Sequence, residues 1–134
     1  MRPKTNDDYA GGTKEMNVFA RLRSGLSRKF RAKWLYRRGM RRAKLGRHQA
    51  AIDDYTVVIE MVEAPGSLRA EALYNRALVY NAADRESDAI SDLNRVMEMV
   101  ETSERVMTEA RRQLVWMKRT HDREDDSSAR RHSE

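Results

Sequence analysis

One stretch of this chain occurs twice, at a distance of 38 residues. Residues 32–63 align with residues 70–101 without a gap, and 13 of the 32 aligned positions are identical. Ordinary residue usage would match roughly two or three by chance. Both copies contain Leu-Tyr-x-Arg, and both end on Glu-Met-Val-Glu. A period of this length is typical of repeat proteins, in which each unit buries its apolar face by packing on its neighbours.

The apolar residues in the second half of each copy follow a helical spacing. They recur at six shared offsets: Ala51, Ile52, Tyr55, Val58, Ile59 and Val62, then Ala89, Ile90, Leu93, Val96, Met97 and Val100. Such spacing marks one buried helix face. The segments that interrupt the pattern are Ser24-Gly25, Gly46, Pro65-Gly66 and Asp84. We therefore predict helices over residues 13–30, 32–45, 48–62, 69–82, 86–100 and 103–119, with Asp84 as an N-cap.

The composition agrees with a helical domain. Of the 134 residues, 40% are hydrophobic and 36% are charged, while Gly and Pro number only 6 and 2. This mixture favours helices with solvated outer faces over sheets. We expect one domain over residues 13–120 between disordered polar segments at 1–12 and 121–134. Because the chain has no cysteine and no long apolar run, we also expect a cytoplasmic protein without a transmembrane segment.

The two copies resemble tetratricopeptide repeats, which are helix–turn–helix units. The large apolar residue of that family's first helix falls on Leu35 and Leu73, and its small residue on Gly39 and Ala77. The second helix matches with Ala51 and Tyr55, and with Ala89 and Leu93. The pattern departs where Arg38 and Arg76 replace a leucine, and where Pro65 comes two residues late.

This resemblance implies an all-α fold. The expected architecture is a short α-solenoid of two hairpins, at residues 32–65 and 70–103, with an N-terminal helix and a C-terminal capping helix over residues 103–119. Two repeats are fewer than such arrays need for stability. We therefore expect the N-terminal helix to cover the first repeat through Phe19, Leu22 and Leu26.

In that family the first helix of each repeat lines a concave face that binds a peptide or helix of a protein partner. The resemblance places these residues there: Tyr36, Arg37, Met40, Lys44, Tyr74, Asn75, Leu78 and Asn81, with Arg112 from the capping helix. Only Asn75 matches the carboxylate clamp that holds the acidic C-termini of chaperones. A role as an adaptor or scaffold for another partner is the leading hypothesis.

The charge of the chain is unevenly distributed. Residues 1–50 hold 15 Lys and Arg against 3 acidic residues, whereas residues 51–134 hold 12 against 18. A basic patch is predicted at Arg28, Arg31, Arg37, Arg38, Arg41 and Arg42. Such a surface can be a solvated face or can attract an acidic protein, RNA or an anionic membrane. The alternatives are thus a basic RNA- or ribosome-associated protein, and an assembly subunit that forms homo-oligomers through its repeat ends.

No catalytic or metal-binding motif is present in the sequence. The three histidines, His48, His121 and His132, are far apart, and acid–base or metal chemistry needs converging partners. The adjacent carboxylates Asp53 and Asp54 point about 100° apart on a helix, so we predict a solvated face for both. We expect no enzyme activity, no catalytic residues, no metal and no cofactor.

Overall fold

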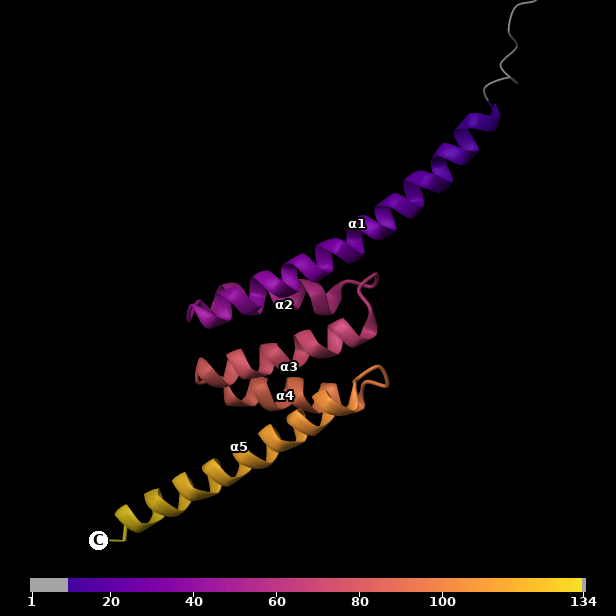
Figure 1. Cartoon of the computed structure of the whole chain (residues 1–134). Coiled ribbons are helices and arrows are strands. Elements are labelled where there is room, and N and C mark those ends of the chain that lie inside the picture. The colour runs from indigo at the N-terminus through magenta and orange to yellow at the C-terminus, as the bar shows by residue number, and fades with distance from the viewer. Residues whose placement is uncertain (1–9, 134) are drawn as a thin grey trace, which may run out of the picture.

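The computed structural model describes residues 10–133, with side chains described from residue 27 onward. Five helices occupy this part of the chain: α1 (Ala10–Lys44), α2 (His48–Glu60), α3 (Gly66–Ala82), α4 (Glu86–Glu98) and α5 (Glu104–Arg131). Each helix packs against the next one along the chain, as Figure 1 shows. The prediction of an all-α fold is confirmed for the described residues.

Short turns join α1 to α2 and α3 to α4, so each of these pairs forms a hairpin. The residues that allow the turns are Gly46 and Asp84, which lie 38 positions apart and adopt positive φ angles of 70° and 58°. Glycine has no steric cost in this left-handed region, and Asp is among the few other residues that tolerate it. Asp84 is therefore a turn residue. The prediction that it caps α4 is wrong, because Arg85 holds the N-cap position.

The core lies between the helices of each hairpin and between the two hairpins. Its largest fully buried side chains are Tyr55, Val58, Leu73, Leu93, Val96 and Met117. Between α1 and α2, a Cβ atom on Gly39 would lie 2.8 Å from Cε1 of Tyr55. In the second hairpin the equivalent residues are Ala77 and Leu93, both fully buried. A larger residue on the second helix thus accompanies a smaller one on the first.

The N-terminal part of the chain differs from the prediction. The expected helices over residues 13–30 and 32–45 form one continuous helix, α1, which passes through Ser24-Gly25 and begins at Ala10. One glycine weakens a helix by only about 1 kcal/mol relative to alanine, so it does not end α1. We expected Phe19, Leu22 and Leu26 to cover the first repeat, but their side chains are outside the described part of the structure. Residues 1–9 are outside it entirely.

The C-terminal boundaries also differ. The predicted disorder from residue 121 is not observed, because α5 continues to Arg131 with exposed side chains. Residues 104–131 contain no Gly or Pro, and local contacts such as His121 Nε2 to Asp125 Oδ2, at 3.4 Å, support the helix. Helices α2 and α4 end two residues early, so Val62 and Val100 are exposed rather than part of the buried stripe.

The contact at Gly39 generates a prediction. Gly39→Ala should lower stability, because overpacking costs about 1–3 kcal/mol and the helix propensity of alanine returns at most about 1 kcal/mol. Gly39→Ala combined with Tyr55→Leu should cost less than the two single changes together, because it installs the residue pair of the second hairpin. Urea denaturation of the three variants measures this coupling. Additive losses would contradict the packing described for this crossing.

Candidate functional site

Four of the residues predicted for the concave face line one cavity between α1 and α3. They are Met40, Lys44, Asn75 and Leu78. The other lining residues are Ala43, His48, Tyr55, Val79 and Ala82. The cavity volume is about 280 Å³, which is just below the range of about 300–1,000 Å³ typical of small-molecule sites. Its size and mainly apolar lining therefore suit an anchoring side chain better than a cofactor.

A hydrogen bond connects the two helices beside this cavity. Asn75 Nδ2 donates to the Tyr36 hydroxyl oxygen at 2.8 Å, and the Tyr36 ring packs on Tyr55 with ring centroids 6.0 Å apart. Burial raises the pKa of Tyr36 to about 12, and the charge of Glu71 adds to this shift. The Tyr36 hydroxyl is therefore neutral at physiological pH and is available as the acceptor for Asn75.

The same face continues from α3 to α5. Glu71 Oε1 lies 3.9 Å from Arg105 Nη2. Burial raises the pKa of Tyr74, with a further contribution from the charge of Glu109, so Tyr74 faces α5. Tyr74 and Asn81 are half-buried, and neither lines the cavity.

Two predicted residues lie apart from the others. Arg37 is exposed and does not line the cavity. Arg112 is also exposed, and its Nη1 donates to Glu109 Oε1 at 3.1 Å. Sequence reasoning missed His48, which lines the cavity from the start of α2. The three-residue turn after α1 was the available signal, because so short a turn holds His48 near the end of α1.

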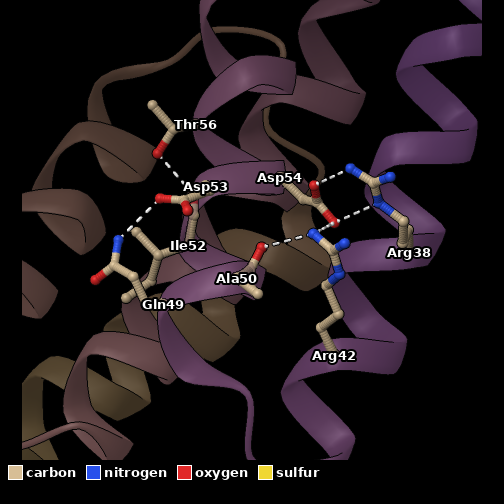
Figure 2. A network of polar contacts seen from close by, with 8 residues as sticks. All are labelled: Arg38, Arg42, Gln49, Ala50, Ile52, Asp53, Asp54 and Thr56. Atoms are coloured by element: carbon tan, nitrogen blue, oxygen red, sulfur yellow. Dashed lines mark hydrogen bonds and ion pairs between the residues drawn. The ribbon is translucent and has the colours of Figure 1, made fainter.

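Half of the predicted basic patch is occupied by internal ion pairs. Figure 2 shows Arg38 and Arg42 converging on Asp54 of α2. Arg38 donates from Nε and Nη2 to the two oxygens of Asp54 at 3.0 and 2.7 Å, and Arg42 donates to Oδ2 at 3.0 Å. Arg28 likewise pairs with Glu63 at 2.7 Å. The prediction of a solvated Asp54 is wrong, because Asp54 is buried.

The neighbouring Asp53 does point to solvent. It is exposed, and its Oδ1 accepts a hydrogen bond from Gln49 at 2.8 Å. The difference between the two carboxylates follows from helix geometry, since adjacent residues on a helix lie about 100° apart. Only the one turned toward α1 meets the arginines.

The second hairpin repeats this arrangement 38 residues later. Arg76 donates from Nε and Nη2 to the two oxygens of Asp92 at 2.7 and 2.8 Å. Its remaining Nη1 donates to Thr56 Oγ1 of the first hairpin at 2.8 Å. Burial by itself would lower the pKa of Arg76, but the hydrogen bonds and charge of Asp92 outweigh it and raise that pKa. We call the pairs Arg38–Asp54 and Arg76–Asp92 the hairpin clamps.

A groove lies between α4 and α5. Its volume is about 600 Å³, and its lining residues are Glu86, Ser87, Ile90, Asn94, Leu114, Lys118 and His121. Helix α5 begins 38 residues after α3. It therefore stands where the first helix of a third repeat would be. Turns follow α1 at residues 45–47 and α3 at residues 83–85. The equivalent residues in the third place are 121–123, and there α5 continues as a helix. No described helix therefore covers this groove.

The described part of the chain has neither a metal-binding cluster nor a membrane-spanning helix. Residues 10–133 contain no group of three or more His, Cys, Asp or Glu arranged to hold a metal ion. In the same residues, no helix has both the length and the apolar composition needed to cross a bilayer. Comparison of the chain with family models, curated proteins and solved structures gives no match.

The hairpin clamps lead to a prediction about stability. Asp92→Asn should cost about 3–5 kcal/mol, because it leaves the charge of Arg76 without a partner in a buried site. Asp54→Asn should cost less, because the side chains of Arg38 and Arg42 are about a third exposed, against 11% for Arg76. Urea denaturation at neutral pH gives the order, with exposed Asp53→Asn as the control. Equal losses for Asp92 and Asp53 would refute the role given to the clamp.

Proposed function

We propose that this chain is a protein-interaction module, similar in design to a tetratricopeptide-repeat adaptor or scaffold. It binds a peptide or helix of a protein partner along the face formed by α1 and α3, and its role is binding rather than catalysis. The observation that carries this proposal is the convergence of Met40, Lys44, Asn75 and Leu78 on one cavity.

The chemistry of the cavity indicates what it binds. Met40 and Leu78 supply apolar surface from two helices, and methionine adapts its shape to irregular ligands. Asn75 is held by its bond to Tyr36, and its amide oxygen can accept a hydrogen bond from a peptide backbone N–H. Lys44 adds a positive charge to the lining of the cavity. A segment with one apolar anchor next to an acidic residue fits this arrangement.

The proposal predicts the behaviour of selected peptides. A displayed library of short peptides, selected on the immobilised chain, should yield sequences that carry an apolar anchor beside Asp or Glu. Leu78→Asp should weaken their binding at least about tenfold, which corresponds to about 1.4 kcal/mol, because it places a charge in the apolar cavity. Asn75→Ala should weaken it through faster dissociation. Fluorescence anisotropy and stopped-flow kinetics measure the two effects.

The control for this experiment is Val100→Asp, which makes the same kind of change at a residue that is 96% exposed after α4. Its binding should equal that of the parent chain. If selected peptides bind the parent and the Leu78 variant equally well, the cavity is not the binding site.

The groove between α4 and α5 favours a second candidate function, which is assembly through the end of the repeat array. Ile90 and Leu114 form its apolar part, and an uncovered repeat end is an apolar surface that a helix of another copy can cover. In this case Asn94→Arg, on the exposed wall of the groove, should shift a dimer to monomer in sedimentation-velocity runs over a range of concentrations. Val62→Arg, on an exposed loop, is the control. A parent chain that stays monomeric throughout would exclude this function.

A further inference from the structure

Helix α1 carries large apolar residues on the side turned away from the core. Phe30 is 70% exposed and Trp34 is 54% exposed, whereas Ala32 and Leu35 of the same helix are buried. Because Phe30 and Trp34 are four residues apart, they lie on one side of α1. In the sequence, leucines at positions 22 and 26 continue the same spacing toward the N-terminus. The helix thus has a second apolar stripe in addition to the one that packs on α2.

Positive charge surrounds this stripe. The sequence of α1 contains twelve Lys and Arg and a single acidic residue. Three of these arginines, at positions 28, 38 and 42, are paired with Glu63 or Asp54. Besides Lys44, which lines the cavity, five further cations of α1 are exposed and have no ion pair within the described residues: Lys29, Arg31, Lys33, Arg37 and Arg41. The internal ion pairs therefore leave a positive outward face on α1.

An exposed helix face with aromatic residues and flanking Lys and Arg has the chemistry of an interfacial helix. Tryptophan prefers the level of the lipid headgroups, and the stems of Lys and Arg lie along apolar surface while their charges reach water or phosphate. Each cation near an anionic surface strengthens attachment by about fivefold. In Figure 1 the N-terminal part of α1 extends beyond α2.

The observations favour a lipid surface over RNA. Stacking on nucleic-acid bases uses the open face of an aromatic ring, but the guanidinium of Arg38 lies 4.4 Å from the centroid of the Trp34 ring and occupies one face. Arg38 is in turn held by Asp54. The sequence continues this spacing with leucine, a residue type that has no stacking role but inserts into the boundary of a bilayer.

We infer that α1 lies on an anionic lipid surface, with Phe30 and Trp34 inserted at the headgroup boundary. The five exposed cations contact the lipid phosphates on either side of them. Since no described helix can cross a bilayer, the attachment is in the plane of the surface. It uses the side of α1 opposite the core and does not depend on the peptide cavity.

Sedimentation with lipid vesicles tests this inference on the full chain. The parent should bind vesicles of phosphatidylcholine containing about a third phosphatidylglycerol, and should not bind phosphatidylcholine alone, because the surface charge drives attachment. Phe30→Ser with Trp34→Ser should reduce binding at least about tenfold. Trp116→Ser is the matched control, because Trp116 is 53% exposed on α5 beside Arg112. This control should bind like the parent.

The control variant also provides a spectroscopic test, because Trp34 is then the only tryptophan. Its emission should shift to shorter wavelength with the anionic vesicles. Leu78→Asp, which blocks the peptide cavity, should bind vesicles normally, so the two proposals can fail separately. Circular dichroism checks that the double variant, Phe30→Ser with Trp34→Ser, is folded. If it is unfolded, the single variant Phe30→Ser is used in the same vesicle experiment.

Three results would overturn the inference. The first is a parent chain that does not bind anionic vesicles or that binds neutral ones equally well. The second is undiminished binding by the folded Phe30 and Trp34 variant. The third is tight binding of single-stranded poly(U) RNA in the absence of vesicle binding, which would assign the outward face of α1 to nucleic acid instead.

Discussion

A buried aspartate on the second helix of each hairpin binds an arginine on the first, and the rest of the structure depends on these two hairpin clamps. Arg76–Asp92 is the more buried of the two, and Arg76 also reaches Thr56 of the preceding hairpin. That arginine thereby connects helices α2, α3 and α4. An ion pair of this kind adds little net stability over apolar residues of the same shape, but loss of one partner is costly. The clamps therefore fix how the helices are positioned more than they stabilise the fold.

The clamps also decide which positive charges are available for binding. Asp54 holds Arg38 and Arg42 against α2, and its single negative charge offsets one of their two positive charges. The positive charges of α1 that are not in these ion pairs lie on two faces of the helix. Lys44 lies at the cavity shared with α3, whereas Arg31 and Arg41 remain exposed. One long helix thus packs on α2 and carries two separate candidate binding surfaces.

Helix α5 shows how a repeat array changes at its end. It starts 38 residues after α3, but the position equivalent to Gly46 and Asp84 is Asp122, which is helical. The position equivalent to Arg38 and Arg76 is Leu114, so α5 lacks the arginine of a hairpin clamp. A straight α5 leaves Ile90 and Leu114 at an open groove. Because α5 continues as one helix and does not turn back, no third hairpin forms and the groove between α4 and α5 stays open. This groove is the surface proposed for assembly.

The sequence by itself determined the period, the helical class and most of the packed positions. Helical spacing is a local property, so Ala51, Tyr55, Ala89 and Leu93 could be assigned to a core without coordinates, and all four are buried. Part of the cavity was also predictable, because the residues of α1 and α3 that face each other recur with the repeat. The tertiary structure decided what depends on contacts between distant residues. The sequence shows an arginine at position 38 and an aspartate at position 54 in the first copy, and the same residue types at the equivalent positions of the second. Only the crossing of the helices shows that Arg38 and Asp54 bind each other and that Asp54 is buried. Burial and ion pairing are set by neighbouring helices, and a local pattern does not contain them.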